Sequence, residues 1–68
     1  MGDIHERLAK NMRLLRRERK LSQEALAHEA DLHRTYVSDL ERCARNPSIS
    51  AIEKIAKALG VSCGQLLD

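Results

Sequence analysis

Aromatic side chains are almost absent from this sequence, and several other residue types are scarce. Its 68 residues include one Tyr, no Trp, no Phe, three Gly, one Pro and two Cys. So few Gly and Pro exclude collagen-like and low-complexity chains. No apolar run reaches the roughly 18 to 20 residues of a membrane-spanning helix, and the first residues lack the apolar stretch of a secretory signal. We therefore expect a cytoplasmic protein with no membrane partner.

The cysteines and histidines do not have the spacing of a metal site. Cys43 and Cys63 form no CxxC motif, and no two of His5, His28 and His33 stand four residues apart on one predicted helix. We interpret the cysteines as reduced packing residues, with a disulfide or a thiol switch as the alternative. Because no catalytic triad and no Gly-rich phosphate loop is visible, the sequence predicts no metal, no cofactor, no small-molecule ligand and no enzymatic activity.

What the chain does contain favours a small helical domain. Hydrophobic residues make up 43% of the sequence and charged residues 32%, which is typical of a globular protein. Leucine and alanine are abundant and valine is rare, so helices are favoured over strands. A chain of this length buries only about 60% of its unfolded surface, which excludes a large internal active site. We predict a single all-α domain over residues 1–68.

Two helices are predicted in the first half of the chain. The first runs from about Asp3, a good N-cap, to about Arg19, and the second is capped by Ser22 and ends before Asp31. Both have one apolar face. The inward positions are Ile4, Leu8, Met12 and Leu15 in the first helix, and Leu26, Ala27 and Ala30 in the second.

A third helix is predicted to begin at Arg34. Leu32 and Val37 have the spacing of a hydrophobic staple, which places His33 at the N-cap. The helix should end near Arg42, because the following segment leads to an Asn-Pro pair that disfavours helix. Its inward side continues with Leu40.

Two more helices complete a predicted compact five-helix bundle. The fourth begins after Ser48 or after Ser50, the latter with a Glu at the capping-box position, and Gly60 ends it. Ser62 and Gln65 form a second capping box, which starts a short helix that reaches the C-terminus. The inward residues of the fourth helix are Ile52, Ile55, Ala56 and Leu59.

The second and third helices, over about residues 22–42, are joined by a short turn that forces a steep crossing of their axes. This is the geometry of a helix-turn-helix, whose second helix fits a DNA major groove about 12 Å wide. The net charge is only +2, but basic residues gather within residues 1–20. Such a basic end either faces DNA phosphates or is an ordinary solvated face. The third helix would present Arg34, Thr35, Ser38, Asp39 and Arg42 outward.

Four strings in order carry a family resemblance: LSQEALA at 21–27, RTYVSDLER at 34–42, NPSI at 46–49 and IAKALGVS at 55–62. Over roughly residues 8 to 67 the chain resembles the helix-turn-helix domains of lambda-type Cro and repressor proteins, the Xre family. The RTY opening and the Arg-Asn pair at 45–46 resemble the controller proteins of restriction-modification systems. The turns differ from the family's frequent Gly, because Lys20, Asp31 and Cys43 occupy them.

The resemblance implies a role for each matching residue. Base reading falls to Arg34, Thr35, Ser38 and Asp39, although Asp39 either accepts from a cytosine or only faces solvent. Contacts to the DNA backbone or groove edge fall to Gln23, Tyr36, Arg45 and Asn46, with a partly buried ring as the alternative for Tyr36. Arg16 and Glu41 match a buried structural ion pair.

The resemblance also implies a transcriptional regulator that binds double-stranded DNA as a homodimer on a (pseudo)palindromic operator. A protein-interaction module, such as a toxin-binding antitoxin or a coactivator, is the alternative, since fold alone does not fix function. The predicted dimer interface consists of Val61, Leu66, Leu67, Ile49 and Ile52, unless the leucines only close the core of the monomer.

Overall fold

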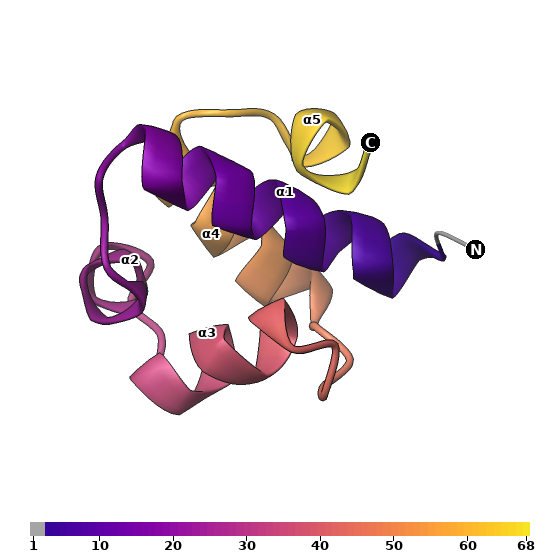
Figure 1. Cartoon of the computed structure of the whole chain (residues 1–68), viewed down its shortest axis with the longest axis horizontal. Coiled ribbons are helices and arrows are strands. Elements are labelled where there is room, and N and C mark those ends of the chain that lie inside the picture. The colour runs from indigo at the N-terminus through magenta and orange to yellow at the C-terminus, as the bar shows by residue number, and fades with distance from the viewer. Residues whose placement is uncertain (1–2) are drawn as a thin grey trace.

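The computed structural model describes residues 3–68, and all the regular secondary structure in that range is helical, which confirms the all-α, five-helix prediction (Figure 1). No helix of these residues is long and apolar enough to cross a membrane. The five helices are α1 (Ile4–Glu18), α2 (Gln23–Glu29), α3 (Arg34–Glu41), α4 (Ile49–Leu59) and α5 (Cys63–Leu67).

Each helix has an N-cap residue whose side chain accepts a hydrogen bond from a backbone N–H of the first turn. Asp3, Ser22 and Ser62 act as predicted, and the His33 ring accepts from the backbone N–H of Thr35. For α4 the structure decides between the two predicted starts. Its N-cap is Ser48, whose hydroxyl accepts from the Ala51 N–H at 3.0 Å.

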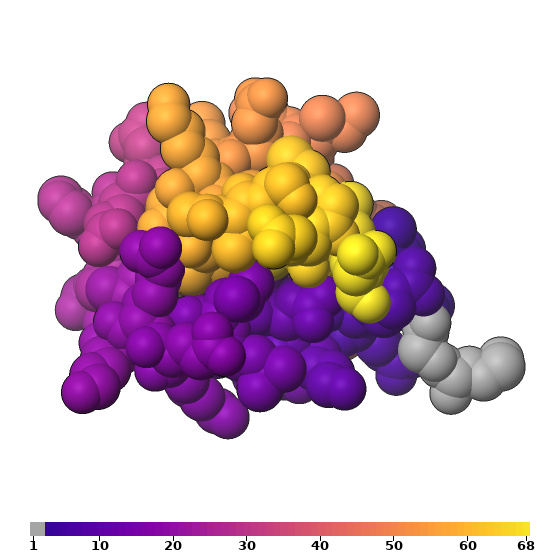
Figure 2. Space-filling model, turned by 90° about the horizontal axis from the view of Figure 1, so that it is seen from above, coloured from indigo at the N-terminus to yellow at the C-terminus, as the bar shows by residue number. Residues whose placement is uncertain are grey.

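The core lies where the apolar faces of all five helices meet. Helix α1 packs against α3 and α5, and α4 packs against α2 and α5. In Figure 2, α5 (yellow) lies against α1 (violet) on one face of the molecule. The largest fully buried side chains are Met12, Leu26, Val37, Leu40, Ile55, Leu59 and Leu66.

Helix α1 also holds α5 by polar contacts. The Asn11 Nδ2 donates to the Leu66 carbonyl at 2.9 Å, and the Arg7 Nε donates to the Leu67 carbonyl at 3.2 Å. These carbonyls belong to the last turn of α5, where no backbone N–H is left within the helix to reach them. Because a five-residue helix is not stable alone, the position of α5 depends on α1.

The first four helices end in the same way, with a residue in the left-handed conformation. The φ angles are 58° at Lys20, 57° at Asp31, 59° at Cys43 and 71° at Gly60. Each turn has the long hydrogen bond of a Schellman motif. These bonds join Leu21 N to Arg16 O, Leu32 N to Ala27 O, Ala44 N to Asp39 O and Val61 N to Ala56 O.

The exposed Lys20 should therefore be a strained position. A left-handed φ costs a residue with a Cβ about 1 to 2 kcal/mol, and glycine avoids this cost while losing more entropy on folding. We expect Lys20→Gly to raise the free energy of unfolding by about 0.5 to 1 kcal/mol in a urea titration. Lys20→Ala keeps the Cβ and serves as the control. Equal stability of the two variants would contradict the strain.

Candidate nucleic-acid interface

Helices α2 and α3 form the predicted helix-turn-helix, joined by residues 30–33 (Figure 1). One side of α3 is anchored in the core by Val37 and Leu40, which are fully or almost fully buried. The opposite side is open to solvent. Its eight residues, with a rise of about 1.5 Å each, make α3 about 12 Å long. A helix with its side chains is about 10 to 12 Å across, so α3 can enter a major groove about 12 Å wide.

Arg34 and Thr35 lie exposed at the first turn of α3. The Arg34 side chain is 68% exposed, and its nearest opposite charge is the equally open Glu24 carboxylate at 3.9 Å. A contact of that length between exposed groups holds the guanidinium only weakly. Ser38, one turn further along, is half-buried. The structure thus brings three of the four predicted base-reading residues to one open surface with their polar groups available.

Asp39, the fourth, is held by two arginines. Its Oδ1 accepts from the Arg42 Nη2 at 2.6 Å, and its Oδ2 lies 3.5 Å from the Arg45 Nε. The hydrogen bond from Arg42, with a smaller contribution from Arg45, lowers the pKa of Asp39 below its ordinary value. Only 16% of the Asp39 side chain is exposed. These two contacts were not predicted from the sequence.

Tyr36 connects α3 to the loop that follows it. Its hydroxyl accepts a hydrogen bond from the backbone N–H of Ser48 at 3.1 Å, and the Arg45 guanidinium lies 4.8 Å from the centre of its ring. This distance permits a cation–π contact. The ring is half-buried, and the hydroxyl still has its own proton to donate. Asn46 is also exposed. It borders a depression that is lined mainly by apolar residues, among them Ile4 and Pro47.

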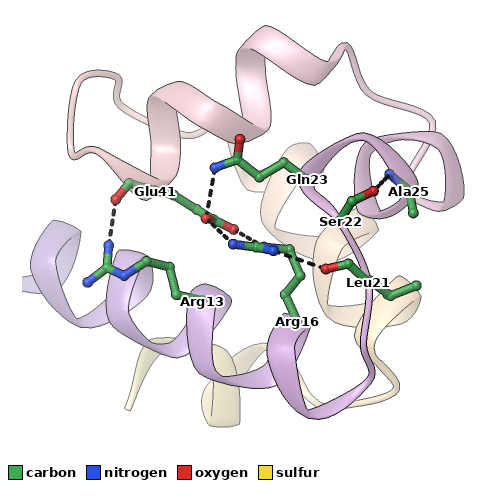
Figure 3. A network of polar contacts seen from close by, with 7 residues as sticks. All are labelled: Arg13, Arg16, Leu21, Ser22, Gln23, Ala25 and Glu41. Carbon is green, nitrogen blue, oxygen red and sulfur yellow. Dashed lines mark hydrogen bonds and ion pairs between the residues drawn. The ribbon is translucent and has the colours of Figure 1, made fainter.

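The predicted ion pair between Arg16 and Glu41 is present as a two-pronged contact that joins α1 to the end of α3 (Figure 3). The Arg16 Nε and Nη2 donate to the two carboxylate oxygens at 2.8 and 3.0 Å, and the Nη1 donates to the Leu21 carbonyl at 3.0 Å. The side chain of Glu41 is 2% exposed and that of Arg16 is 13% exposed. The hydrogen bond to Glu41 raises the pKa of Arg16.

Two further residues join this network without having been predicted there. The Gln23 Nε2 donates to Glu41 Oε1 at 3.0 Å, and the Arg13 Nη1 donates to the Glu41 backbone carbonyl at 2.6 Å (Figure 3). Gln23 therefore uses one amide N–H internally, and its second amide N–H is left for another acceptor. A basic residue three positions before Arg16 on the same helix face was the available signal for Arg13.

The residues predicted for a dimer interface divide into two groups. Ile49 is 87% exposed, and Ile52, Val61 and Leu67 are half-buried. Leu66 is 0% exposed because its side chain fills the core, so its predicted interface role is wrong. Ile4 was predicted to face inward, but it is 48% exposed and lines one depression together with Pro47, Ile52 and Leu67.

Comparisons with known proteins agree with this geometry. The family model described as Helix-turn-helix matches residues 12–66. The control protein C.BamHI of Bacillus amyloliquefaciens is 65% identical over 48 residues, which are 71% of this chain and 59% of that protein.

Two solved structures are also close to this one. A hypothetical transcription factor of Neisseria has a TM-score of 0.94 and 52% identity over 97% of this chain and 76% of its own. The restriction-modification controller protein C.AhdI of Aeromonas hydrophila has a TM-score of 0.85 and 40% identity over 88% of this chain and 91% of its own. The chain spans about three fifths of the length of the first curated relatives. On the strength of the matched family model and of these likenesses, the chain belongs to the Xre-type helix-turn-helix family.

Proposed function

We propose that this chain is a transcriptional regulator that binds double-stranded DNA as a homodimer, as a control protein of a restriction-modification system. One observation carries the proposal. The outer side of α3 presents the Arg34 and Thr35 side chains to solvent, while Val37 and Leu40 anchor its inner side. The names of its relatives C.BamHI and C.AhdI support the assignment to a control protein.

Each predicted contact residue has a role in the proposed complex. Arg34 reads a guanine through O6 and N7, and Thr35 and Ser38 meet a thymine methyl or a base edge. Gln23, Tyr36, Arg45 and Asn46 contact the DNA backbone or the groove edge, and their N–H and O–H groups are donors suited to phosphate oxygens. Asp39 shares this surface, but both of its carboxylate oxygens already face arginines.

The proposed dimer follows from the small size of α3. One helix of eight residues reads only a few base pairs, whereas two copies on half-sites about 34 Å apart supply both affinity and specificity. The exposed side chain of Ile49 and the depression lined by Ile4, Ile52 and Leu67 offer an apolar face for a second copy. Val61 is half-buried and is kept as a further residue of the proposed interface.

A mobility-shift titration with the DNA upstream of its own gene tests the proposal. Preference for that DNA over unrelated DNA, with affinity that falls as salt rises, is the expected result. Binding with neither preference nor salt dependence contradicts it and favours the interaction-module alternative. Sedimentation of the free protein and of the complex gives the number of copies in each.

Arg34→Ala and Gln23→Ala should change DNA binding in two different ways. Arg34→Ala is expected to cost about 1 to 3 kcal/mol of binding free energy and to relax base preference at one position of each half-site. Gln23→Ala removes a phosphate contact and should weaken binding to all sequences about equally. Titrations against DNA with single base changes measure both effects. If the two variants behaved alike, the division between base reading and backbone contact would be wrong.

A further inference from the structure

Arg42, at the C-cap of α3, and Arg45, in the loop that follows, both contact the carboxylate of Asp39. Arg42 donates to Asp39 Oδ1 at 2.6 Å, and the Nε of Arg45 lies 3.5 Å from Asp39 Oδ2. Arg42 is largely exposed and Arg45 is half-exposed, so both guanidinium groups can be reached from solution. Asp39 lies between them with little of its side chain exposed.

A carboxylate and a DNA phosphate are bound by the same chemistry. The planar guanidinium donates two parallel N–H groups, and both anions offer two oxygens at a matching spacing. An arginine that is engaged with Asp39 therefore has to exchange one anion for another when it binds DNA. Asp39 also adds a negative charge close to the phosphates, which opposes binding to DNA of any sequence.

We infer, on the basis of the proposed function, that Asp39 is an internal competitor of DNA phosphates for Arg42 and Arg45. This competition by Asp39 lowers the affinity for DNA of every sequence by about the same amount. The preference for particular bases still depends on Arg34 and Thr35. Arg45 keeps a second support without Asp39, because its guanidinium rests over the Tyr36 ring. Removal of the carboxylate charge therefore frees the arginines while Arg45 stays in position.

Asp39→Asn tests the competition, and the chain offers a matched control. Asp31→Asn changes the net charge by the same amount at an exposed turn residue that takes no part in the proposed DNA contacts. Its φ of 57° is also tolerated by Asn. The probes are a fluorescent duplex of random sequence and the duplex from upstream of the gene, titrated at several salt concentrations. Circular dichroism establishes that both variants are folded.

With Asp39→Asn we expect both duplexes to bind about three- to tenfold more tightly, because the ion pairs of Asp39 with the two arginines no longer compete. The slope of log K against log salt should become steeper by about one, and base preference should stay unchanged. In an Arg42→Gln background most of the gain should disappear, since the competition acts through that arginine. The Asp31→Asn control should show a smaller gain and an unchanged slope.

Any one of the following results would overturn the inference. Weaker binding to both duplexes would mean that Asp39 is needed to position the arginines, and a loss of preference at one base position would make it a base reader. An equal gain with Asp31→Asn would reduce the effect to net charge. If the wild-type protein prefers its upstream DNA but Asp39→Asn shows no gain in DNA affinity, this inference alone is wrong. A wild-type protein that binds neither duplex removes the proposed function as well.

Discussion

Arg16→Met is expected to lower the free energy of unfolding by about 3 to 5 kcal/mol, because it leaves a buried carboxylate without its countercharge. The side chain of Glu41 is 2% exposed and would keep only the hydrogen bond from Gln23. The carbonyl of Leu21 would lose its partner as well. A domain of this length has a total stability of about 3 to 10 kcal/mol, so the variant should be close to unfolding. Chemical denaturation followed by circular dichroism measures the difference.

Two further variants make this expectation specific. Arg17→Met is the same change on the next residue of α1, which is exposed, and should shift the stability by no more than about 0.5 kcal/mol. The double variant Arg16→Met with Glu41→Met removes both charges and should recover most of the lost stability, because no unpaired charge stays buried. A cost below about 1 kcal/mol for Arg16→Met would show that the ion pair does not hold α1 to α3.

Ile49→Glu is expected to abolish dimer formation and to weaken binding to the operator by about 100-fold or more. In a symmetric interface each copy would bring one desolvated and unpaired charge, at a cost of about 2 kcal/mol or more for each. The monomer should stay folded, because Ile49 is 87% exposed and an acidic residue at the first turn of α4 is favourable to the helix dipole. Sedimentation and operator titration give the two readouts.

Leu14→Glu is the matched control for that experiment. Leu14 is 49% exposed on α1 and does not line the depression shared by Ile4 and Leu67. The same apolar-to-acidic change there should leave both dimerisation and operator binding nearly intact. If Ile49→Glu stayed dimeric, the self-association surface would have to lie elsewhere on the molecule.

The helices of this chain were predictable because their signals are local. Ser22, His33 and Ser62 cap helices as the sequence indicates, and Gly60 ends α4. Ser48 and Ser50 could not be separated, because both satisfy the same local rule. The structure uses Ser48, whose own N–H is bound by the Tyr36 hydroxyl from another helix.

The contacts of the candidate site were harder to foresee, because they join residues from different elements. The bond from Gln23 to Glu41 spans two helices, and the pairing of Arg45 with Asp39 depends on the path of a loop. Leu66 was predicted at the dimer interface, with the core of the monomer as the alternative, and the packing of α5 buries it in the core. Charge and hydropathy patterns give the face on which a residue lies, but they do not give its partner.

Helix α1 has one more consequence for a pair of these molecules. Arg13 and Arg16 fasten it to the end of α3, and Arg7 and Asn11 fasten it to the last turn of α5. Helix α3, which is proposed to contact DNA, and α5, which lies beside the proposed dimer interface, are thus both attached to α1. In a two-fold dimer, α1 would therefore fix the distance between the two copies of α3. Operators whose half-sites are spaced differently should bind poorly, because the dimer cannot adjust to them.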